Sequence, residues 1–277
     1  MNYRKSIQND NSKFNQPYSF RYQFIAKLLY LCFKKIIKVE EPLYSLKISQ
    51  PVIFAYNHNN YFETIVLGSY LINRWPKRRL SFIVDWMYGH LPVIGWLLRS
   101  FQPIYVYRKR ARWDFLNRRK ETPARQSLQE CLACLAQGGS LGIFPEGTRN
   151  PDPLVLKRGR RGIGEIALRS EVPVVPVGID FPAGKRCGRI PACGRIILRF
   201  GSPLHFTAEI SAWRRAQQYI ALSPKAQEKF RVFLCRRITH TIMQELARLS
   251  GKHYPYRQPE GFGAMANFSS YLLNRGE

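Results

Sequence analysis

The 277-residue chain is long enough for one large α/β domain, and its composition, 45% hydrophobic and 13% aromatic, excludes a disordered or fibrous protein. Its 44 Lys and Arg residues against 18 Asp and Glu give a net charge of +26 and a pI near 10.2. This positive field attracts nucleic acid, an anionic membrane or an acidic substrate, and charge alone does not choose among them.

We expect neither a membrane-spanning segment nor an export signal. The apolar stretch at 24–37 is interrupted by three lysines. The uncharged run at 86–98 is shorter than the ~20 residues that a helix needs to cross a bilayer. The first residues are polar and no cleavage pattern follows an apolar core. The chain is therefore expected to stay on the cytoplasmic side.

The N-terminal part divides into a polar tail at 1–18 and a helix at 19–38. The helix alternates basic residues with apolar ones, which include Phe20, Phe24, Leu28, Leu31 and Ile36. A basic amphipathic helix of this kind can lie in a membrane interface with its apolar face down. The alternative is an ordinary surface helix that packs on its own domain.

Beyond the helix, short apolar runs alternate with segments of helical periodicity. The expected strands are 51–56, 80–84, 104–107, 141–144, 172–179 and 195–200. The expected helices are 64–73, 123–137, a segment ending at 169, and roughly 225–249. This alternation predicts an α/β fold with a largely parallel central sheet flanked by helices. Because no repeat or linker interrupts it, we expect one domain at 39–255 and a C-terminal tail at 256–277.

The six cysteines do not form a recognisable framework. Cys131 and Cys134 lie three apart, whereas Cys187 and Cys193 lie six apart. A zinc site made of these four is conceivable, but the second spacing does not fit a zinc ribbon. Reduced and mostly buried thiols are the favoured interpretation.

His58 is the first residue that suggests chemistry. It directly follows a predicted buried strand, where α/β sheets commonly place their sites, and four residues separate it from Glu63. If the turn folds back, the carboxylate can hold one imidazole nitrogen and leave the other to take a proton from a hydroxyl. A His with a Glu at this spacing also arises by coincidence, so this pair alone does not assign catalysis.

The second polar cluster, Phe144-Pro-Glu-Gly-Thr-Arg149, also follows a strand. Its glycine allows close approach of the backbone to a ligand, and the forked donors of Arg149 suit phosphate. The alternative is a tight turn stabilised by a contact between Glu146 and Arg149. Arg108, which lies beside Lys109 and Arg110, offers a further anion site or a solvated basic edge.

Four blocks in order carry a family resemblance. They are Asn57-His58-x4-Glu63, Val106-Tyr-Arg108, Phe144-Pro-Glu-Gly-Thr-Arg149 and Val172-Pro-Val-Val-Pro-Val177. This set resembles the signature of the glycerolipid acyltransferases, the PlsC-like family of 1-acylglycerol-3-phosphate acyltransferases. Flanking segments agree, and the resemblance covers about residues 40 to 255.

The resemblance implies an O-acyltransferase of phospholipid biosynthesis, with 39–255 as the acyltransferase domain. An acyl group from acyl-CoA or acyl-carrier protein is expected to move to the hydroxyl of a lysophospholipid such as 1-acylglycerol-3-phosphate. His58 is implied as general base, Glu63 as the group that orients it, and Arg108 as the ligand of the acceptor phosphate. The rest of the implied acceptor site is Glu146, Gly147, Thr148 and Arg149. No acyl-enzyme intermediate, metal or cofactor is implied.

Two positions depart from the family's pattern. Glu63 stands where the family usually has Asp, and Asp85 stands near a point where many members carry a lysine that helps to bind the anionic substrate. These departures keep two alternatives open. The acceptor could be another lipid alcohol, or the chain could be a catalytically impaired homologue that binds lipid.

The positive charge fits an anionic membrane surface as a partner. Lys and Arg near anionic phospholipid contribute about 1 kcal/mol each to attraction, so we expect a peripheral or monotopic protein on the cytoplasmic face of a membrane. Nucleic acid is not an expected partner, because no helix-turn-helix, zinc finger or RNA-stacking motif is present and the basic residues are scattered over many elements.

Overall fold

The structure is a computed structural model. It describes residues 18, 20–40, 50–60, 63–76, 79–90, 95–96, 98, 101, 103–106, 124–181, 195–218 and 223–259.

A central sheet of seven described strands organises the fold. Its strands are β1 (Ile37–Glu40), β2 (Ile53–Tyr56), β3 (Leu80–Asp85), β4 (Ile104–Val106), β5 (Ser140–Ile143), β6 (Val174–Asp180) and β7 (Ile196–Phe200). Their order in the sheet is β1-β7-β6-β2-β5-β3-β4. The β6–β7 pair is antiparallel and all other neighbours are parallel. The predicted α/β fold with a largely parallel sheet is thus confirmed.

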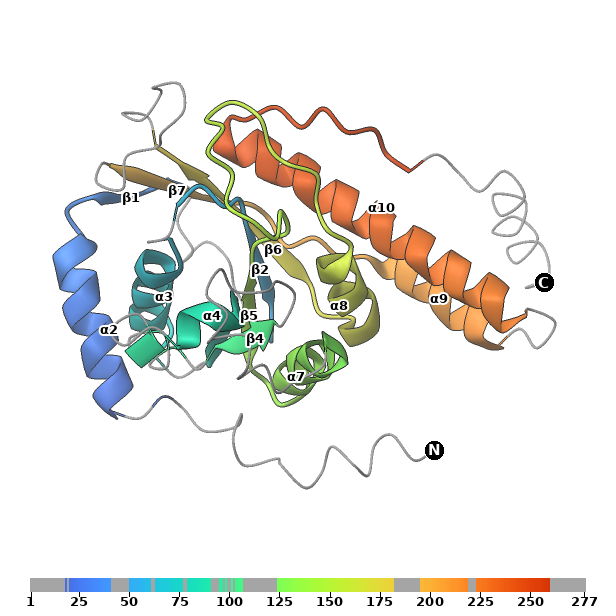
Figure 1. Cartoon of the computed structure of the whole chain (residues 1–277), viewed down its shortest axis with the longest axis horizontal. Coiled ribbons are helices and arrows are strands. Elements are labelled where there is room, and N and C mark those ends of the chain that lie inside the picture. The colour runs from blue at the N-terminus through green and yellow to red at the C-terminus, as the bar shows by residue number, and fades with distance from the viewer. Residues whose placement is uncertain are drawn as a thin grey trace.

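Helices cover both faces of this sheet. The described helices are α2 (Phe20–Phe33), α3 (Glu63–Arg74), α4 (Trp86–Gly89), α7 (Ala124–Ala136), α8 (Gly162–Ser170), α9 (Thr207–Gln218) and α10 (Pro224–Ser250). Figure 1 shows α2 and α3 on one side of the sheet and α8 and α10 on the other. The long helix α10 begins with Ser223, whose Oγ accepts a hydrogen bond from the Ala226 amide, followed by Pro224.

The alternation of side chains along the central strand β2 explains the two layers of core. Ile53 and Ala55 pack in the cluster formed with α7, α8 and α10, whereas Phe54 and Tyr56 pack in the cluster formed with α3. All four side chains are fully buried. A strand between two helical layers must be apolar on both faces, and this is why residues 51–56 read as a continuous apolar run.

The structure changes the N-terminal prediction in one respect. Helix α2 ends at Phe33, five residues before the expected end at 38, and residues 37–40 form strand β1, which pairs in parallel with β7. Ile37 and Val39 are β-branched and favour a strand once the edge of β7 offers backbone hydrogen bonds. Like strand β1, helix α9 was not predicted from the sequence.

Helix α2 is apolar on two opposite sides. Ala26 is buried, and Tyr22 and Leu29 pack beside it on the domain, while α2 as a whole lies against α3. The stripe that the sequence indicated points the other way, and 46% to 83% of each of its side chains is exposed. Its members are Phe20, Phe24, Leu28 and Leu31. One face of α2 therefore packs on the domain, and the other presents large apolar side chains to the surroundings.

Two other expectations concern membrane spans and cysteines. Within the described part of the chain, no helix is both long enough and apolar enough to cross a bilayer. Cys131 and Cys134 are buried free thiols, and burial raises the pKa of Cys134 to about 11. The described residues contain no group of His, Cys, Asp and Glu that could hold a metal ion. Cys187 and Cys193 lie outside the described residues.

Candidate active site

Parallel pairing brings the two polar clusters of the sequence together. Strands β2 and β5 are neighbours, with Ala55 opposite Ile143. The residues that follow both strands therefore leave the sheet at the same edge. The amide of His58 donates to Glu146 Oε1 at 2.9 Å, and the Asn150 amide donates to the His58 carbonyl at 2.7 Å. Residues 57–60 and 144–150 thus form one continuous site.

His58 and Glu63 form the central pair of the site. His58 Nδ1 lies 2.9 Å from Glu63 Oε2, and the Glu63 carboxylate is buried at the first turn of α3. A carboxylate only accepts hydrogen bonds, so in the neutral ring Nδ1 carries the proton and Nε2 is left as an acceptor. The His58 ring also packs on Phe144 with 4.2 Å between centroids. The imidazole is therefore held in one orientation by a hydrogen bond and a ring contact.

Asn59 holds the far side of the Glu63 carboxylate. Its amide nitrogen donates to Oε2 at 2.8 Å, and its side-chain Nδ2 donates to Oε1 at 2.8 Å. Both oxygens of Glu63 are thus fixed by donors within a single turn. The start of a helix also favours a negative charge electrostatically. These contacts keep the carboxylate aimed at the imidazole.

Glu146 connects the two clusters from inside. Its side chain is 2% exposed, and besides the His58 amide it accepts hydrogen bonds from the Asn150 side chain at 2.9 Å and the Lys157 amide at 2.8 Å. Burial raises the pKa of Glu146, while these hydrogen bonds and nearby Lys252 act in the opposite direction. Glu146 can therefore contact an acceptor lipid directly only if it gives up one of these hydrogen bonds.

A buried lysine lies behind the pair. Lys252, just after α10, donates from Nζ to Asn59 Oδ1 at 2.6 Å and to the Asp152 carbonyl at 2.8 Å. Burial lowers the pKa of Lys252, and the carboxylates of Glu146 and Glu63 counter this effect. The end of α10 is therefore part of the site although it lies almost 200 residues from His58.

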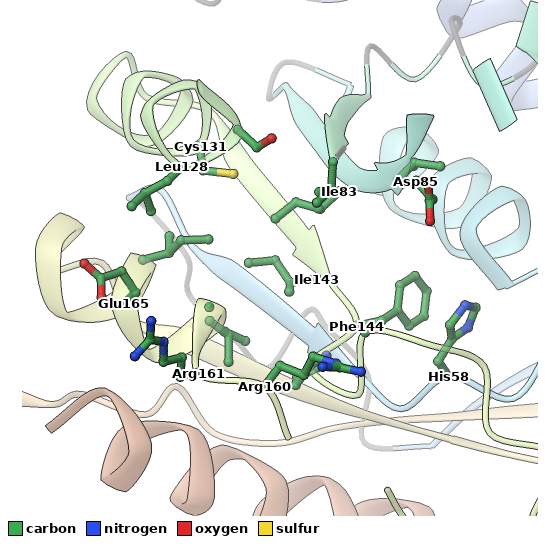
Figure 2. Close-up of a pocket in the computed structure, with 18 of the residues that line it drawn as sticks. His58, Ile83, Asp85, Leu128, Cys131, Ile143, Phe144, Arg160, Arg161 and Glu165 are labelled. Atoms are coloured by element: carbon green, nitrogen blue, oxygen red, sulfur yellow. The ribbon is translucent and has the colours of Figure 1, made fainter. Parts of the chain in front are cut away.

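The front of His58 faces a cavity of about 1430 Å³. Figure 2 shows His58, Phe144 and Asp85 at one end of the cavity and Glu165 and Arg161 at the other. The wall between the two ends is mainly apolar. Its labelled members are Ile83, Leu128, Cys131 and Ile143. The cavity is larger than the ~300–1,000 Å³ of an ordinary ligand pocket, and it is shaped for an elongated apolar group that ends near a histidine.

Arginines line the same cavity beside the turn after β5. Gly147 has φ of 66°, the left-handed conformation that favours glycine, and its Cα faces the aliphatic part of Arg160 so closely that an added Cβ would lie 2.9 Å from it. Figure 2 shows Arg160 extended along the wall toward the His58 end. Arg149 and Thr148 belong to the same lining. Arg149 and Arg160 therefore add cationic donors to the lining of the cavity that His58 faces.

The structure brings together most of the residues that the sequence singled out. His58, Gly147, Thr148 and Arg149 line the cavity, whereas Glu63 and Glu146 lie behind its wall and position the others. Arg108 lies outside the described residues. Asp85 lines the cavity at the His58 end, where its negative charge faces the site.

Three residues of the site were not predicted: Asn59, Arg160 and Lys252. Asn59 and Arg160 border the recognised motifs, so the sequence offered a weak local signal for them. Lys252 had none, because only the folded chain brings the end of α10 to Asn59.

The fold and this site describe an enzyme-like α/β domain in which a histidine–carboxylate pair can take a proton from a ligand in a long apolar cavity. The family model described as "Acyltransferase" matches residues 36–180, slightly more than half of the chain. The chain belongs to this acyltransferase family, and the predicted PlsC-like resemblance is confirmed.

Two curated relatives are both named 1-acyl-sn-glycerol-3-phosphate acyltransferase. The chain is 26% identical over 165 residues to "1-acyl-sn-glycerol-3-phosphate acyltransferase CHLREDRAFT_174358" of Chlamydomonas reinhardtii, a match that covers 58% of this chain and 45% of the relative. It is 27% identical over 157 residues to the 1-acyl-sn-glycerol-3-phosphate acyltransferase of Bacillus subtilis, covering 55% and 66%. The matches thus span about half to two thirds of the relatives' length.

A solved structure is also similar. It is the 1-acyl-sn-glycerophosphate acyltransferase PlsC from Thermotoga maritima, with 19% identity, a TM-score of 0.47 and coverage of 79% of each chain.

Proposed function

We propose that this chain is an O-acyltransferase that moves a fatty acyl group from a thioester to the hydroxyl of a lysophospholipid, with 1-acylglycerol-3-phosphate as the first candidate. The observation that carries this proposal is the 2.9 Å contact between His58 Nδ1 and Glu63, combined with the position of His58 at the end of a long apolar cavity. The names of the relatives point to the same reaction.

The reaction begins at His58 Nε2. This nitrogen makes no hydrogen bond with the described residues, and it takes the proton of the acceptor hydroxyl. The oxygen attacks the thioester carbonyl, the C–S bond breaks, and the thiolate leaves with the proton that His58 carries. Glu63 stabilises the imidazolium formed in between. No bond to the enzyme forms, so catalysis comes from holding two substrates together and from proton removal.

The lining of the cavity fits both substrates. An acyl chain is matched by the apolar part of the wall. A phosphate of the acceptor is matched by Arg149 and Arg160, because guanidinium groups bind phosphate through paired hydrogen bonds. Asp85 opposes a second negative charge at the same end, which keeps another lipid alcohol as an alternative acceptor.

The proposal is tested by incubating the purified protein with acyl-CoA or acylated carrier protein as donor and with a panel of lipid acceptors. We expect thioester cleavage that depends on lysophosphatidate, and a diacyl product of matching mass. A dependence on a non-phosphorylated lipid alcohol instead identifies the alternative acceptor. Cleavage that no acceptor accelerates contradicts acyl transfer and favours a lipid-binding homologue.

A membrane surface is the proposed partner of the exposed stripe on α2. Phe20, Phe24, Leu28 and Leu31 recur at helical spacing and are exposed, and the chain carries a charge of +26. Apolar side chains that enter the interface and basic residues that attract anionic headgroups together hold a domain on a bilayer.

We expect Phe24→Ser combined with Leu28→Ser to weaken binding to phosphatidylglycerol-containing vesicles by about tenfold or more, because burying each such side chain contributes about 1.5–3 kcal/mol. Vesicle co-sedimentation measures the change. The matched control is Leu154→Ser, which removes an equally exposed leucine outside α2. Equal weakening by the control, or equal binding of the parent to neutral vesicles, contradicts this arrangement.

A further inference from the structure

The C-terminal end of α10 supplies a buried cation that no part of the proposed reaction uses directly. Gly251 ends the helix with φ of 67°, and the next residue, Lys252, is 9% exposed. The segment after it is tied down, because the His253 amide donates to the Leu154 carbonyl and the Leu156 amide donates to the His253 carbonyl. Lys252 is therefore held at a fixed place behind the site.

Four carboxylates interact electrostatically with this ammonium group. They are Glu146 of the turn after β5, Glu63 of α3, Asp152 of the following loop and Asp180 of β6. Glu63 and Glu146 are 1% and 2% exposed, so neither charge is well solvated. Buried like charges are stable only when an opposite charge lies among them. Lys252 meets this requirement at the back of the site.

The hydrogen bonds of Lys252 also fix the orientation of Asn59. An asparagine amide can present either its oxygen or its nitrogen to a neighbour. Because Lys252 Nζ donates to Oδ1, the nitrogen of the amide must point the other way, where it donates to Glu63 Oε1 at 2.8 Å. A reversed amide places two oxygens against each other. The contact with Lys252, which is shorter than the 3.4 Å contact of Asn57 Nδ2 with the same oxygen, therefore helps to hold Asn59 in the orientation that supports the carboxylate.

We infer that Lys252 is a positioning residue for the His58–Glu63 pair: its ammonium group fixes the Asn59 side chain, which in turn holds the Glu63 carboxylate against His58 Nδ1. The kinetic consequences of this inference rest on the proposed function. Its structural consequence, the orientation of the His58–Glu63 pair, does not depend on which reaction the protein catalyses. Glu146, which accepts from the His58 amide, also interacts with the Lys252 charge, whereas Asp85 and the arginines of the cavity wall face His58 from the other side.

Lys252→Met tests the charge, because methionine fills most of the volume without a cation or a donor. We expect kcat to fall by about tenfold or more while KM changes less than about twofold, since the interaction supports the reacting group and not substrate binding. Lys252→Arg keeps the charge and hydrogen-bond donors and is expected to restore most of the parental kcat. Lys229→Met, an exposed position on α10, is the matched control.

The route through Asn59 is tested by a double-mutant cycle. If Lys252 acts through Asn59, the combination of Lys252→Met with Asn59→Ala lowers kcat by less than the product of the two single effects. Single effects that multiply in the double mutant, or a folded Lys252→Met protein with parental kcat, overturn the inference. If the methionine variant does not fold, Asn59→Ala decides alone. It breaks the link and leaves the charge, and parental kcat in that variant overturns the inference.

NMR separates this inference from the proposed reaction. The His58 ring nitrogen signals, assigned by their loss in His58→Ala, report which ring nitrogen carries the proton in the parent and in Lys252→Met. We expect the tautomer protonated at Nδ1 to predominate in the parent and to be less populated in the variant, whether or not lysophosphatidate is the acceptor. An unchanged tautomer population overturns the role of Lys252, whereas absent acyl transfer with the expected change overturns only the proposed function.

Discussion

His58→Ala is expected to lower kcat for acyl transfer by about 10²–10⁴-fold, the contribution of a well-placed general base. Without the imidazole, the acceptor hydroxyl has no positioned base to take its proton. KM for both substrates is expected to change little, because the ring contributes to one end of a long cavity whose walls remain. Steady-state kinetics with lysophosphatidate and one acyl-CoA measure the effect.

Two comparisons make this result specific. His205→Ala removes an exposed histidine that is not part of the cavity lining and is expected to leave kcat unchanged. Imidazole added to the His58→Ala protein is expected to restore part of the rate, since the space left beside Phe144 can hold the free base. A folded His58→Ala protein with parental kcat contradicts the role of His58 as general base.

The sequence was most informative where the physical cause of a structure is local. The run at 51–56 predicted β2 because a strand buried on both faces must be apolar throughout, and the periodicity of 123–137 predicted α7 from one apolar face. Strand β1 was hidden because its four residues continue a basic and apolar pattern that also suits a helix. Its strand conformation depends on the edge of β7, which is remote in sequence. The pairing of β1 with β7 in the folded protein therefore determines the strand conformation of residues 37–40.

The same distinction applies to the site. Glu63 and His58 are close in the sequence, and their spacing predicted that the carboxylate could reach the imidazole. That Glu146 turns inward to the His58 amide depends on the pairing of β2 with β5, which the sequence indicates only as a shared sheet. The contact of Lys252 with Asn59 depends on where a 27-residue helix ends, and no local pattern marks it.

Position 63 shows why a departure from the family's pattern need not prevent the chemistry. Glutamate is one methylene longer than the usual aspartate, yet its Oε2 lies at hydrogen-bond distance from His58, and both of its oxygens accept from Asn59. The positions of His58, Asn59 and Glu63 therefore accommodate the longer side chain. A shorter aspartate at position 63 does not reach both neighbours from the same position without movement.

Glu63→Gln and Glu63→Asp are accordingly expected to be impaired for different reasons. In Glu63→Gln the size is kept, but the amide group turns donors toward His58 Nδ1 or the Asn59 amide, which disfavours the tautomer with a free Nε2. By comparison with the loss of about 10⁴-fold when a triad carboxylate becomes an amide, we expect kcat to fall by about 10²–10⁴-fold. In Glu63→Asp the charge remains, but the carboxylate retracts by about 1 Å or more, a misplacement that costs about 10²-fold.

The comparison of the two variants decides how the carboxylate acts. Both are to be measured with thermal unfolding and with kcat and KM for lysophosphatidate, and Glu245→Gln on α10 is a control that removes only a surface ion pair with Arg248. If Glu63→Gln retains parental kcat, the charge and the tautomer are unimportant, and proton removal by His58 loses its support. If Glu63→Asp is fully active and Glu63→Gln is not, the site adapts to the shorter side chain. The presence of a carboxylate then matters and the length of its side chain does not.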